Sequence, residues 1–442
     1  MQNMRKISAA VMSLGMSLSL MSCGMFTEIE QPGKPSSSAE SAADSTADSP
    51  AQTTDGTVTT AAPATLPTTE ATTEATTAPP AVQPAKVHVL AVGDNLVQTG
   101  VYNAAKRWSS VPGSYDFTKT YENIVPLVQA ADVAIINQET LICGEGYEVS
   151  GADFNFNSPP ELGTAMVKAG FDVFTLANNH VRDKGVDGLK ASLDYWDSMM
   201  EQYPILAVGV YRSKADQSKI RVQEVNGLKI AYLAYTEHMN GYTIPDDAGV
   251  VVGLTSEEAL IKKQIEEAHE IADAVIVAAH WGNEDTHTVR DDVKALAKKM
   301  VDWGADVILG SHPHTAQTME YLTRSDGTRG FVFYSLGNFI SAQTDNFNVV
   351  GEMGEFDLVL DGTGKLSVED VTCMPVITHY DDAAFSNLRL YPYDLYTPQL
   401  AASHGLPYAP MGTAKSFSMD VIDRIVEANF PAEFRKLKRD AD

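Results

Sequence analysis

The segment Val307-Ile308-Leu309-Gly310-Ser311-His312-Pro313-His314 passes directly from apolar residues to a loop that carries two imidazoles. The apolar part predicts a strand that is buried on both faces. His312 and His314 flank Pro313, which we expect to hold the loop backbone extended. Two imidazoles presented by one stiff loop favour a metal site, and this segment is the strongest single indication of one in the chain.

Four further apolar runs end in the same way, each followed at once by polar residues of metal-ligand type. With the residues that follow them, these runs are 87–92 with Gly93-Asp94, 133–136 with Asn137-Gln138-Glu139, 173–176 with Asn178-Asn179-His180, and 274–279 with His280-Trp281-Gly282. In α/β folds the carboxyl ends of the strands line one edge of the sheet, where ligands bind. The five loops therefore bring carboxylate, amide and imidazole groups together, which predicts a two-metal site for hydrolytic chemistry.

Taken singly, these residues also have ordinary structural explanations. Asp94 and Glu139 suit loop caps, the Asn178-Asn179 pair suits a turn, and His280 suits a buried core position. Their convergence at one sheet edge is what favours metal ligands. Three nearby side chains are further candidates: Asp183, which we expect to cap the next helix, Glu284, close behind His280, and His238, which follows the 229–234 strand.

Composition limits the classes of partner. The chain has 442 residues, 44% of them apolar, and a formal net charge of −26. A protein that binds nucleic acid normally carries a basic surface, so we expect no nucleic-acid partner. Cys143 and Cys373 lie far apart in the sequence, which indicates two unpaired thiols more readily than a disulfide framework or a structural zinc site.

The N-terminus predicts a lipoprotein signal peptide over residues 1–22. Arg5 and Lys6 precede an apolar, serine-rich stretch that is too short and too polar to span a membrane comfortably. The stretch ends in Leu20-Met21-Ser22-Cys23-Gly24, which resembles a bacterial lipobox. We expect lipidation of Cys23, which would anchor the protein to the bacterial cell membrane outside the cytoplasm. The alternative is an ordinary signal peptide with an incidental cysteine.

Three regions follow this anchor. Residues 23–85 are rich in Thr, Ala, Ser and Pro and predict a disordered stalk. We expect the folded domain over 86–375, with a C-terminal extension, 376–442, packed on it. Helices are predicted between the early strands at 121–130, 160–170, 188–200, 256–271 and 291–303, and a final helix at 419–428. Later runs at 318–322, 330–334, 355–360 and 365–374 predict an antiparallel set, so the pattern indicates mixed sheets covered by helices.

Six sequence blocks, in this order, resemble the CapA-type poly-gamma-glutamate capsule synthesis proteins. They are AVGDNL (91–96), INQE (136–139), ANNHVRDKG (177–185), AAHWGNED (278–285), GSHPHTAQ (310–317) and YSLGNF (334–339). That family is similar to the calcineurin-like metallophosphoesterases. The resemblance implies an α/β fold, a four-layer α-β-β-α sandwich of two mixed sheets flanked by helices. It also implies one or two divalent metal ions (manganese, zinc or iron) and membrane subunits of a polyglutamate synthase as partners.

The same resemblance implies a role for each motif residue. Asp94 and His314 would hold a first metal, with Glu139 bridging to a second metal held by Asn179, His280 and His312. His180 would act as general acid or stabilise developing charge. Our candidates for contact with substrate are Asn178, Asp183, Glu284, Gly337 and Asn338.

Two positions depart from the phosphoesterase pattern. The usual Asp-x-His of the first motif is Asp94-Asn95-Leu96 here, so one imidazole is missing, and Glu139 stands where Asp is usual. Three functions therefore stay open. The first is a surface metal-dependent hydrolase or transferase that acts on an anionic polymer such as polyglutamate. The others are a cell-surface metallophosphatase or nucleotidase, and a non-catalytic accessory of a membrane polymer synthase.

Overall fold

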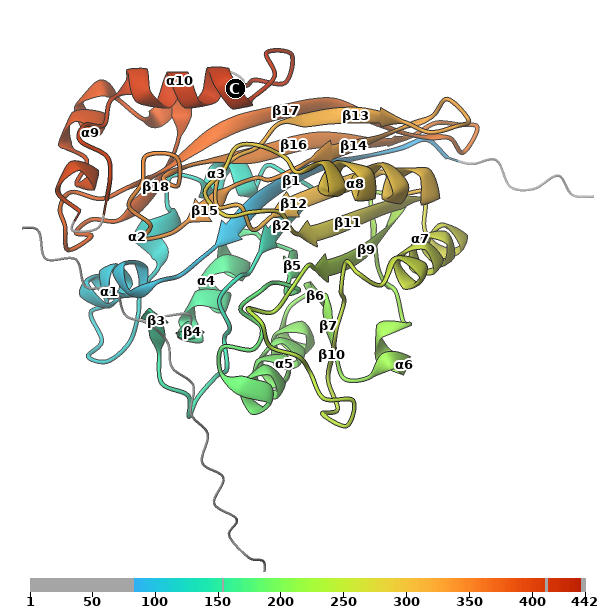
Figure 1. Cartoon of the computed structure of the whole chain (residues 1–442), viewed down its shortest axis with the longest axis horizontal. Helices are drawn as coiled ribbons and strands as arrows, with labels where there is room; N and C mark the ends of the chain where they lie inside the picture. The colour runs from blue at the N-terminus through green and yellow to red at the C-terminus, as the bar shows by residue number, and fades with distance from the viewer. Residues whose placement is uncertain (1–82, 153–154, 410–411, 439–442) are drawn as a thin grey trace, which may run out of the picture. The chain divides into compact units, whose positions relative to one another are not determined.

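The computed structural model describes residues 83–152, 155–409 and 412–438 (Figure 1). The expected signal peptide, the lipidation at Cys23 and the expected stalk up to residue 82 lie outside these described residues. Within the described ranges, no helix combines the length and the apolar character needed to cross a membrane.

An eight-stranded mixed sheet carries three of the five expected strands. Its order is β18-β17-β16-β1-β2-β5-β6, with β15 also paired to β1. Strands β1, β2, β5 and β6 are parallel, whereas β16 runs antiparallel to β1. The strands span Arg389–Pro392 (β18), Leu366–His379 (β17), Val350–Leu360 (β16), Ala85–Asn95 (β1), Val133–Asn137 (β2), Val173–Thr175 (β5), Leu206–Val208 (β6) and Asn338–Ile340 (β15).

A six-stranded mixed sheet carries the other two expected strands. Its order is β13-β14-β12-β11-β9-β8, in which β14, β12, β11 and β9 are parallel and the two edge strands are antiparallel. The strands span Met319–Thr323 (β13), Arg329–Phe333 (β14), Val307–Ser311 (β12), Ala274–His280 (β11), Leu228–Thr236 (β9) and Arg221–Val225 (β8). The turn between β8 and β9 contains Asn226 and Gly227, both with positive φ, as the Asn-Gly sequence predicts.

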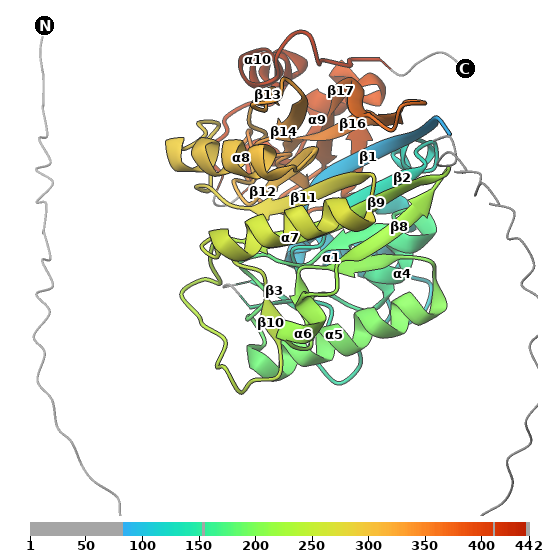
Figure 2. The ribbon, with the colours of Figure 1, turned by 90° about the vertical axis from the view of Figure 1, so that its right-hand side faces the viewer.

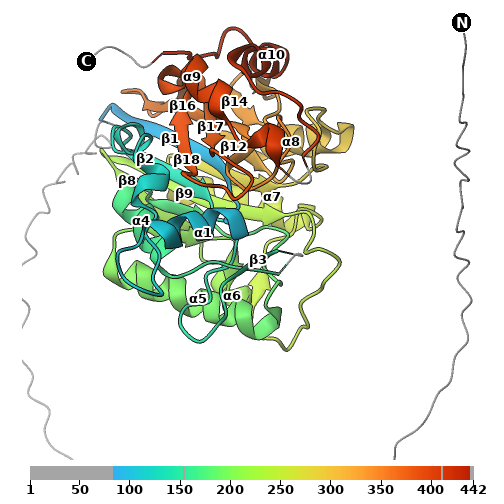
Figure 3. The same cartoon turned by 90° about the vertical axis from the view of Figure 1, so that its left-hand side faces the viewer.

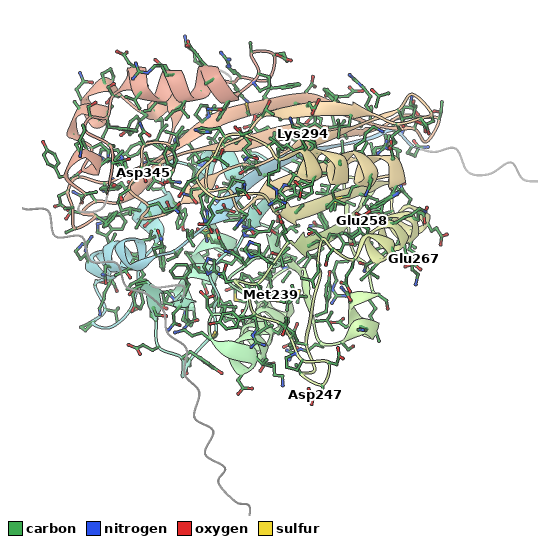
Figure 4. All side chains as sticks on the ribbon, in the orientation of Figure 1. Met239, Asp247, Glu258, Glu267, Lys294 and Asp345 are labelled. Atoms are coloured by element: carbon green, nitrogen blue, oxygen red, sulfur yellow. The ribbon has the colours of Figure 1, made fainter. Side chains whose placement is uncertain are left out.

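Helices flank both sheets. Helices α7 (Glu258–Ile271) and α8 (Asp291–Trp303) cover the outer face of the six-stranded sheet, where Ile265 packs in one apolar cluster with Val277 and Met300 (Figure 2). The polar faces of these helices point away from that cluster, as the labelled residues Glu258, Glu267 and Lys294 show in Figure 4. On the eight-stranded sheet, helices α4 (Glu161–Ala169) and α5 (Gly185–Gln202) provide the cover.

The two sheets pack against each other through apolar side chains. Phe333 of β14 lies against Phe356 of β16, with ring centroids 6.3 Å apart. On the far side of the eight-stranded sheet, Phe174 of β5 packs on Trp196 of α5, with centroids 4.6 Å apart. The expected sandwich of two mixed sheets flanked by helices is confirmed.

The C-terminal elements lie beside the β16–β17 hairpin, where Figure 3 draws them in red. β17 runs through residue 375, at which we expected the main domain to end, and β18 adds another strand to the same sheet. The other short elements are α1 (Thr99–Trp108), α6 (Lys214–Gln217), η1 (Tyr393–Leu395), α9 (Pro398–Ser403), η2 (Leu406–Tyr408), α10 (Met419–Asn429), and the two-stranded pairs β3 (Ser150–Ala152) with β4 (Asn155–Asn157) and β7 (Val210–Tyr211) with β10 (Val251–Val252).

Two expectations about elements are wrong. The helix expected over 121–130 is two short helices, α2 (Thr118–Tyr121) and α3 (Val125–Val128), because Pro126 has no N–H for a helical hydrogen bond and starts a new helix instead. The late strands are not one antiparallel set. They form two hairpins in different sheets, β13–β14 and β16–β17, and β14 lies parallel to β12.

Candidate metal centre

Glu139 is the centre of the site. It follows β2 at the carboxyl edge of the eight-stranded sheet, and its side chain is 0% exposed. Both carboxylate oxygens are buried and have no hydrogen-bond partner among the residues that the structure describes. Three imidazole Nε2 atoms surround Oε1, that of His280 at 3.7 Å and those of His180 and His314 at 3.8 Å. These distances are too long for hydrogen bonds.

Asp94 and His314 form one side of the cluster. Oδ2 of Asp94 lies 3.1 Å from Nδ1 of His314, and Oδ1 accepts a hydrogen bond of 2.7 Å from Nδ2 of Asn137. Ligand atoms of Asp94, Glu139 and His314 all lie within 4.8 Å of one another. The structure thus brings together the three residues expected around the first metal.

Asn179, His280 and His312 form the other side. Oδ1 of Asn179 lies 3.0 Å from Nε2 of His280. The rings of His280 and His312 have centroids 4.8 Å apart, and Nδ1 of His312 is buried with no hydrogen-bond partner in the described part of the chain. These are the residues expected around the second metal. Asn179 and His312 lie on the loops after β5 and β12, and His280 is the last residue of β11.

The electrostatics favour a cation between these groups. Burial and the neighbouring carboxylate of Asp94 raise the pKa of Glu139 well above its usual range. Burial alone would lower the pKa of His314, but the carboxylates of Glu139 and Asp94 outweigh it and raise that pKa to about 10. Both shifts favour added positive charge in the cluster, whether a proton or a metal ion supplies it.

On the other side, the imidazoles are neutral. Burial, reinforced by the neighbouring histidines, lowers the pKa of His280 well below its usual range. The same causes lower the pKa of His312 to about 2. A neutral imidazole keeps a nitrogen lone pair for a metal, so both side chains are in the form that binds metal ions.

His180 has a carboxylate partner. Its Nδ1 lies 2.9 Å from Oδ2 of Asp183, and its ring packs on Phe156 with centroids 4.5 Å apart. Oδ2 of Asp183 also accepts a hydrogen bond from the backbone N–H of Phe156. Asp183 therefore orients His180; it does not cap α5, whose N-cap is Lys184 and has no side-chain cap, contrary to our expectation.

The loop that carries the two histidines is not extended. His312 has φ of +98° and His314 has φ of +57°, so both flank Pro313 in conformations that non-glycine residues rarely adopt. The expectation that Pro313 holds an extended backbone is wrong: the chain turns sharply there, and the backbone N–H of His312 points at Asp94. Such strain is concentrated at functional sites.

The remaining candidates take different positions. Nδ2 of Asn178 binds the carbonyl of Gln138, and Nδ2 of Asn338 binds Ser341, Gln343 and the carbonyl of Asn348, so both amides hold loops together. The carbonyl of Gly337 accepts a hydrogen bond from the N–H of Asp94. Glu284 is exposed and lines a pocket together with His180 and His314.

Sequence reasoning missed several side chains that contact the cluster. Asn137 fixes Asp94, and Oγ of Ser311 lies 2.9 Å from Nδ1 of His280. His238, which the sequence had already indicated as a further candidate, packs edge-on against His312, with centroids 5.0 Å apart, in the loop after β9 that also contains the labelled Met239 (Figure 4). The signal for Asn137 and Ser311 was their position at strand ends, next to residues already singled out.

This donor set fits divalent metal ions. Zinc, for example, bonds to nitrogen and oxygen at about 2.0–2.2 Å, so donors around one ion lie roughly 3 to 4 Å apart. The separations of 3.7 and 3.8 Å from Oε1 of Glu139 to Nε2 of His280 and of His314 match that spacing. Carboxylate, amide and imidazole donors suit several first-row metals, so the geometry does not select one.

The family model of the bacterial capsule synthesis protein PGA_cap matches residues 88–343, more than half of the chain. The chain belongs to the PGA_cap family. All residues of the cluster lie inside the PGA_cap match.

Two curated relatives of this PGA_cap chain are similar in sequence. The PGA biosynthesis protein CapA of Bacillus subtilis (strain 168) is 30% identical over 252 residues, 57% of this chain and 64% of that protein. The capsule biosynthesis protein CapA of Bacillus anthracis is 29% identical over 292 residues, 64% of this chain and 66% of that protein. The matches thus span just under two thirds of the relatives' own lengths.

Among solved structures, the NAD nucleotidase of Haemophilus influenzae aligns with a TM-score of 0.40 and 12% identity, over 81% of this chain and 65% of that chain. Similarity at this level says nothing about the substrate of the PGA_cap chain.

Proposed function

We propose that this PGA_cap protein is a metal-dependent hydrolase or transferase that acts on an anionic polymer of the capsule, such as polyglutamate, or on its precursor. The observation that carries the proposal is Glu139, a fully buried carboxylate whose oxygens have no hydrogen-bond partner among the described residues and whose Oε1 faces three imidazole nitrogens. A carboxylate left this way is costly to bury, and a metal ion is the partner that the geometry fits.

Each residue has a distinct task in this proposal. Asp94, Glu139, Asn179, His280, His312 and His314 would hold one or two divalent ions, which act as Lewis acids on a carbonyl or phosphoryl oxygen when bound. His180, oriented by Asp183, would give a proton to the leaving group or stabilise the charge that develops on it. Phe156 packs on the His180 ring and keeps water from that side.

The first test is the metal content of the purified full chain after reconstitution with manganese, zinc or iron. We expect about one or two ions per chain in the wild type and loss of metal in His312→Ala. A matched control is His88→Ala, which removes a half-exposed histidine of β1 outside the cluster and should leave the metal content unchanged. A wild type that binds no metal would instead support the non-catalytic accessory role.

Turnover then separates the remaining functions. Metal-dependent cleavage or transfer of glutamyl amides, absent in the Glu139→Gln variant, is the expected result. Turnover of phosphate esters alone would replace the proposal with a cell-surface metallophosphatase or nucleotidase.

We also propose that the protein is held outside the cytoplasm by a lipid on Cys23 and works beside membrane subunits of a polymer synthase. The support is the lipobox-like Leu20-Met21-Ser22-Cys23-Gly24 behind a charged and apolar stretch. Cys23→Ser should release the protein from the membrane fraction, and synthase subunits should co-purify with the wild type. Membrane retention of the variant would count against the anchor.

A further inference from the structure

A small pocket of about 240 Å³ opens directly beside the metal centre. His180 and His314 form part of its wall, and Leu96 and Phe156 provide apolar surface. Ligand pockets commonly enclose about 300–1,000 Å³, so this one suits a single small group more than a stretch of polymer.

Two glutamine side chains give the pocket fixed hydrogen-bond donors. Oε1 of Gln98 accepts a hydrogen bond of 2.8 Å from the N–H of Ala342, and Oε1 of Gln343 accepts one of 2.6 Å from Nδ2 of Asn338. Because these contacts occupy the oxygen ends, each amide has its Nε2 group left to donate. Among the described residues, neither Nε2 group has an acceptor, and both glutamines line this one pocket.

Glu284 gives the same pocket a negative charge. It is exposed, and within the described ranges it forms no ion pair with a basic side chain. Its carboxylate lies close enough to the cluster to act electrostatically on both Glu139 and His314. An acid at this position repels the carboxylates along an anionic chain and attracts a cation.

We propose that this pocket binds an α-amino-acid end group, with the ammonium at Glu284 and the carboxylate at the Nε2 groups of Gln98 and Gln343. The inference rests on the proposed function and names the part of the polymer that the site takes. In a γ-linked glutamate chain, the amino-terminal unit has an ammonium and a carboxylate on one carbon. Each internal unit has a carboxylate and an amide N–H instead. The pocket therefore selects the amino-terminal end, and its first linkage faces His180.

The test is calorimetric binding to the metal-reconstituted full chain, with γ-glutamyl-glutamate and its N-acetylated form as probes. We expect the wild type to bind the free-amine form at least about tenfold more tightly, as loss of a charge-assisted contact implies. Glu284→Gln should remove this preference. Gln98→Leu should lower the affinity for both probes by a similar factor, because both probes keep the carboxylate.

Asp285→Asn is the matched control. It removes the neighbouring acid, whose carboxylate accepts a hydrogen bond from Asn348 and does not line the pocket, and it should leave the preference intact. Any of three results would overturn the inference. The wild type could bind the two probes equally or bind neither, or Glu284→Gln could keep the preference for the free amine.

Metal content and turnover are measured on the same samples. If the protein prefers the free-amine probe but shows no turnover, the end-group pocket is supported and the proposed catalysis fails. Turnover without the preference would leave the catalytic proposal standing and remove the pocket.

Discussion

At the scale of single residues, the site is built around groups that the fold alone would not favour. Within the described ranges, the two buried oxygens of Glu139 and Nδ1 of His312 have no hydrogen-bond partner, and His312 and His314 hold rare backbone conformations. Each of these features costs free energy in the absence of a bound ligand. Their concentration within one cluster is the physical reason to assign function there.

Replacing the Glu139 carboxylate by an amide separates function from stability. Glu139→Gln keeps the side-chain shape but removes a buried charge, so we expect metal content to fall at least about tenfold. In the presence of a chelator the variant should unfold at the same temperature as the wild type or higher, because it no longer buries an unpaired carboxylate. Elemental analysis and thermal unfolding with and without chelator measure both effects. Metal content equal to that of the wild type would contradict the assignment.

Asp183 acts through His180. Asp183→Asn weakens the contact that orients the imidazole, so turnover should fall about 10- to 100-fold while metal content stays unchanged. Asp187→Asn, at an exposed position in the first turn of α5, is the control and should change neither. Loss of metal in Asp183→Asn would show that the residue supports the metal ligands and not the proton transfer.

The same scale shows what the sequence could and could not predict. The ligand-type residues at strand ends were found because apolar runs mark the strands and ligands bind at their carboxyl ends. The expectation of one sheet edge was wrong, since β1, β2 and β5 belong to one sheet and β11 and β12 to the other. Gln98 and Gln343 were not found, since nothing in their local sequence fixes which end of each amide faces the pocket. The orientation of Gln98 depends on Ala342, far along the chain, and that of Gln343 on the side chain of Asn338 at the start of β15.

At the scale of elements, the close approach of β1 and the β15 region positions Asp94. A methyl group added at Gly93 would lie 1.9 Å from the carbonyl oxygen of Gly337, so only glycine fits without moving backbone. We expect Gly93→Ala to destabilise the protein by about 3 kcal/mol and to reduce metal binding, because Asp94 is displaced.

Gly362 in the β16–β17 turn provides the comparison. Among the described residues, a methyl group there would meet only the Cγ of Pro84, at 3.8 Å. Gly362→Ala should therefore lower the free energy of unfolding by less than about 0.5 kcal/mol. Denaturant unfolding of both variants gives the difference. Equal free energies of unfolding would show that the β1–β15 contact is more adaptable than its geometry indicates.

Element prediction failed where pairing depends on distant partners. The apolar pattern located the strands β13, β14, β16 and β17 but not their division between two sheets, which the partners β12 and β1 decide. The pattern also continued one helix through Pro126, where steric exclusion outweighs apolar periodicity. Helix α8, which begins and ends where predicted, is stopped by Gly304 in a positive-φ conformation.

The segment after β17 contains a buried histidine that makes its stability depend on pH. Nε2 of His404 lies 2.9 Å from the carbonyl of Thr378, and its Nδ1 accepts a hydrogen bond from the N–H of Leu406. Burial, with a smaller contribution from His379, lowers the pKa of His404 to about 3. In the unfolded chain that pKa is about 6.5. The contribution of His404 to the free energy of unfolding is therefore complete above about pH 6.5 and is lost as the pH falls toward 3.

We expect the unfolding temperature to fall between about pH 6.5 and pH 4.5, with His404 contributing up to about 1.4 kcal/mol per pH unit. His404→Gln cannot take up the proton and should make this dependence less steep by the contribution of His404, while the buried His280 and His312 keep theirs. His269→Gln, at an exposed position in α7, should not. Thermal unfolding of the wild type and both variants across the pH series tests this prediction. If the slope of unfolding temperature against pH is unchanged in His404→Gln, other groups cause the dependence.

At the scale of the whole molecule, the net charge of −26 opposes binding of a long anionic polymer. Recognition of the amino-terminal end group alone resolves this conflict, because the internal carboxylates then need no contact. We expect the affinity for long polyglutamate to rise as salt increases from about 0.01 to 0.15 M, since the Debye length shortens from about 30 to about 8 Å and screens the repulsion. The dipeptide γ-glutamyl-glutamate, which lacks the long run of carboxylates, should change much less. Binding titrations across the salt series compare the polymer with the dipeptide. If the affinity for the polymer falls as salt increases, the protein has a basic polymer-binding surface. That outcome would contradict recognition of the end group alone.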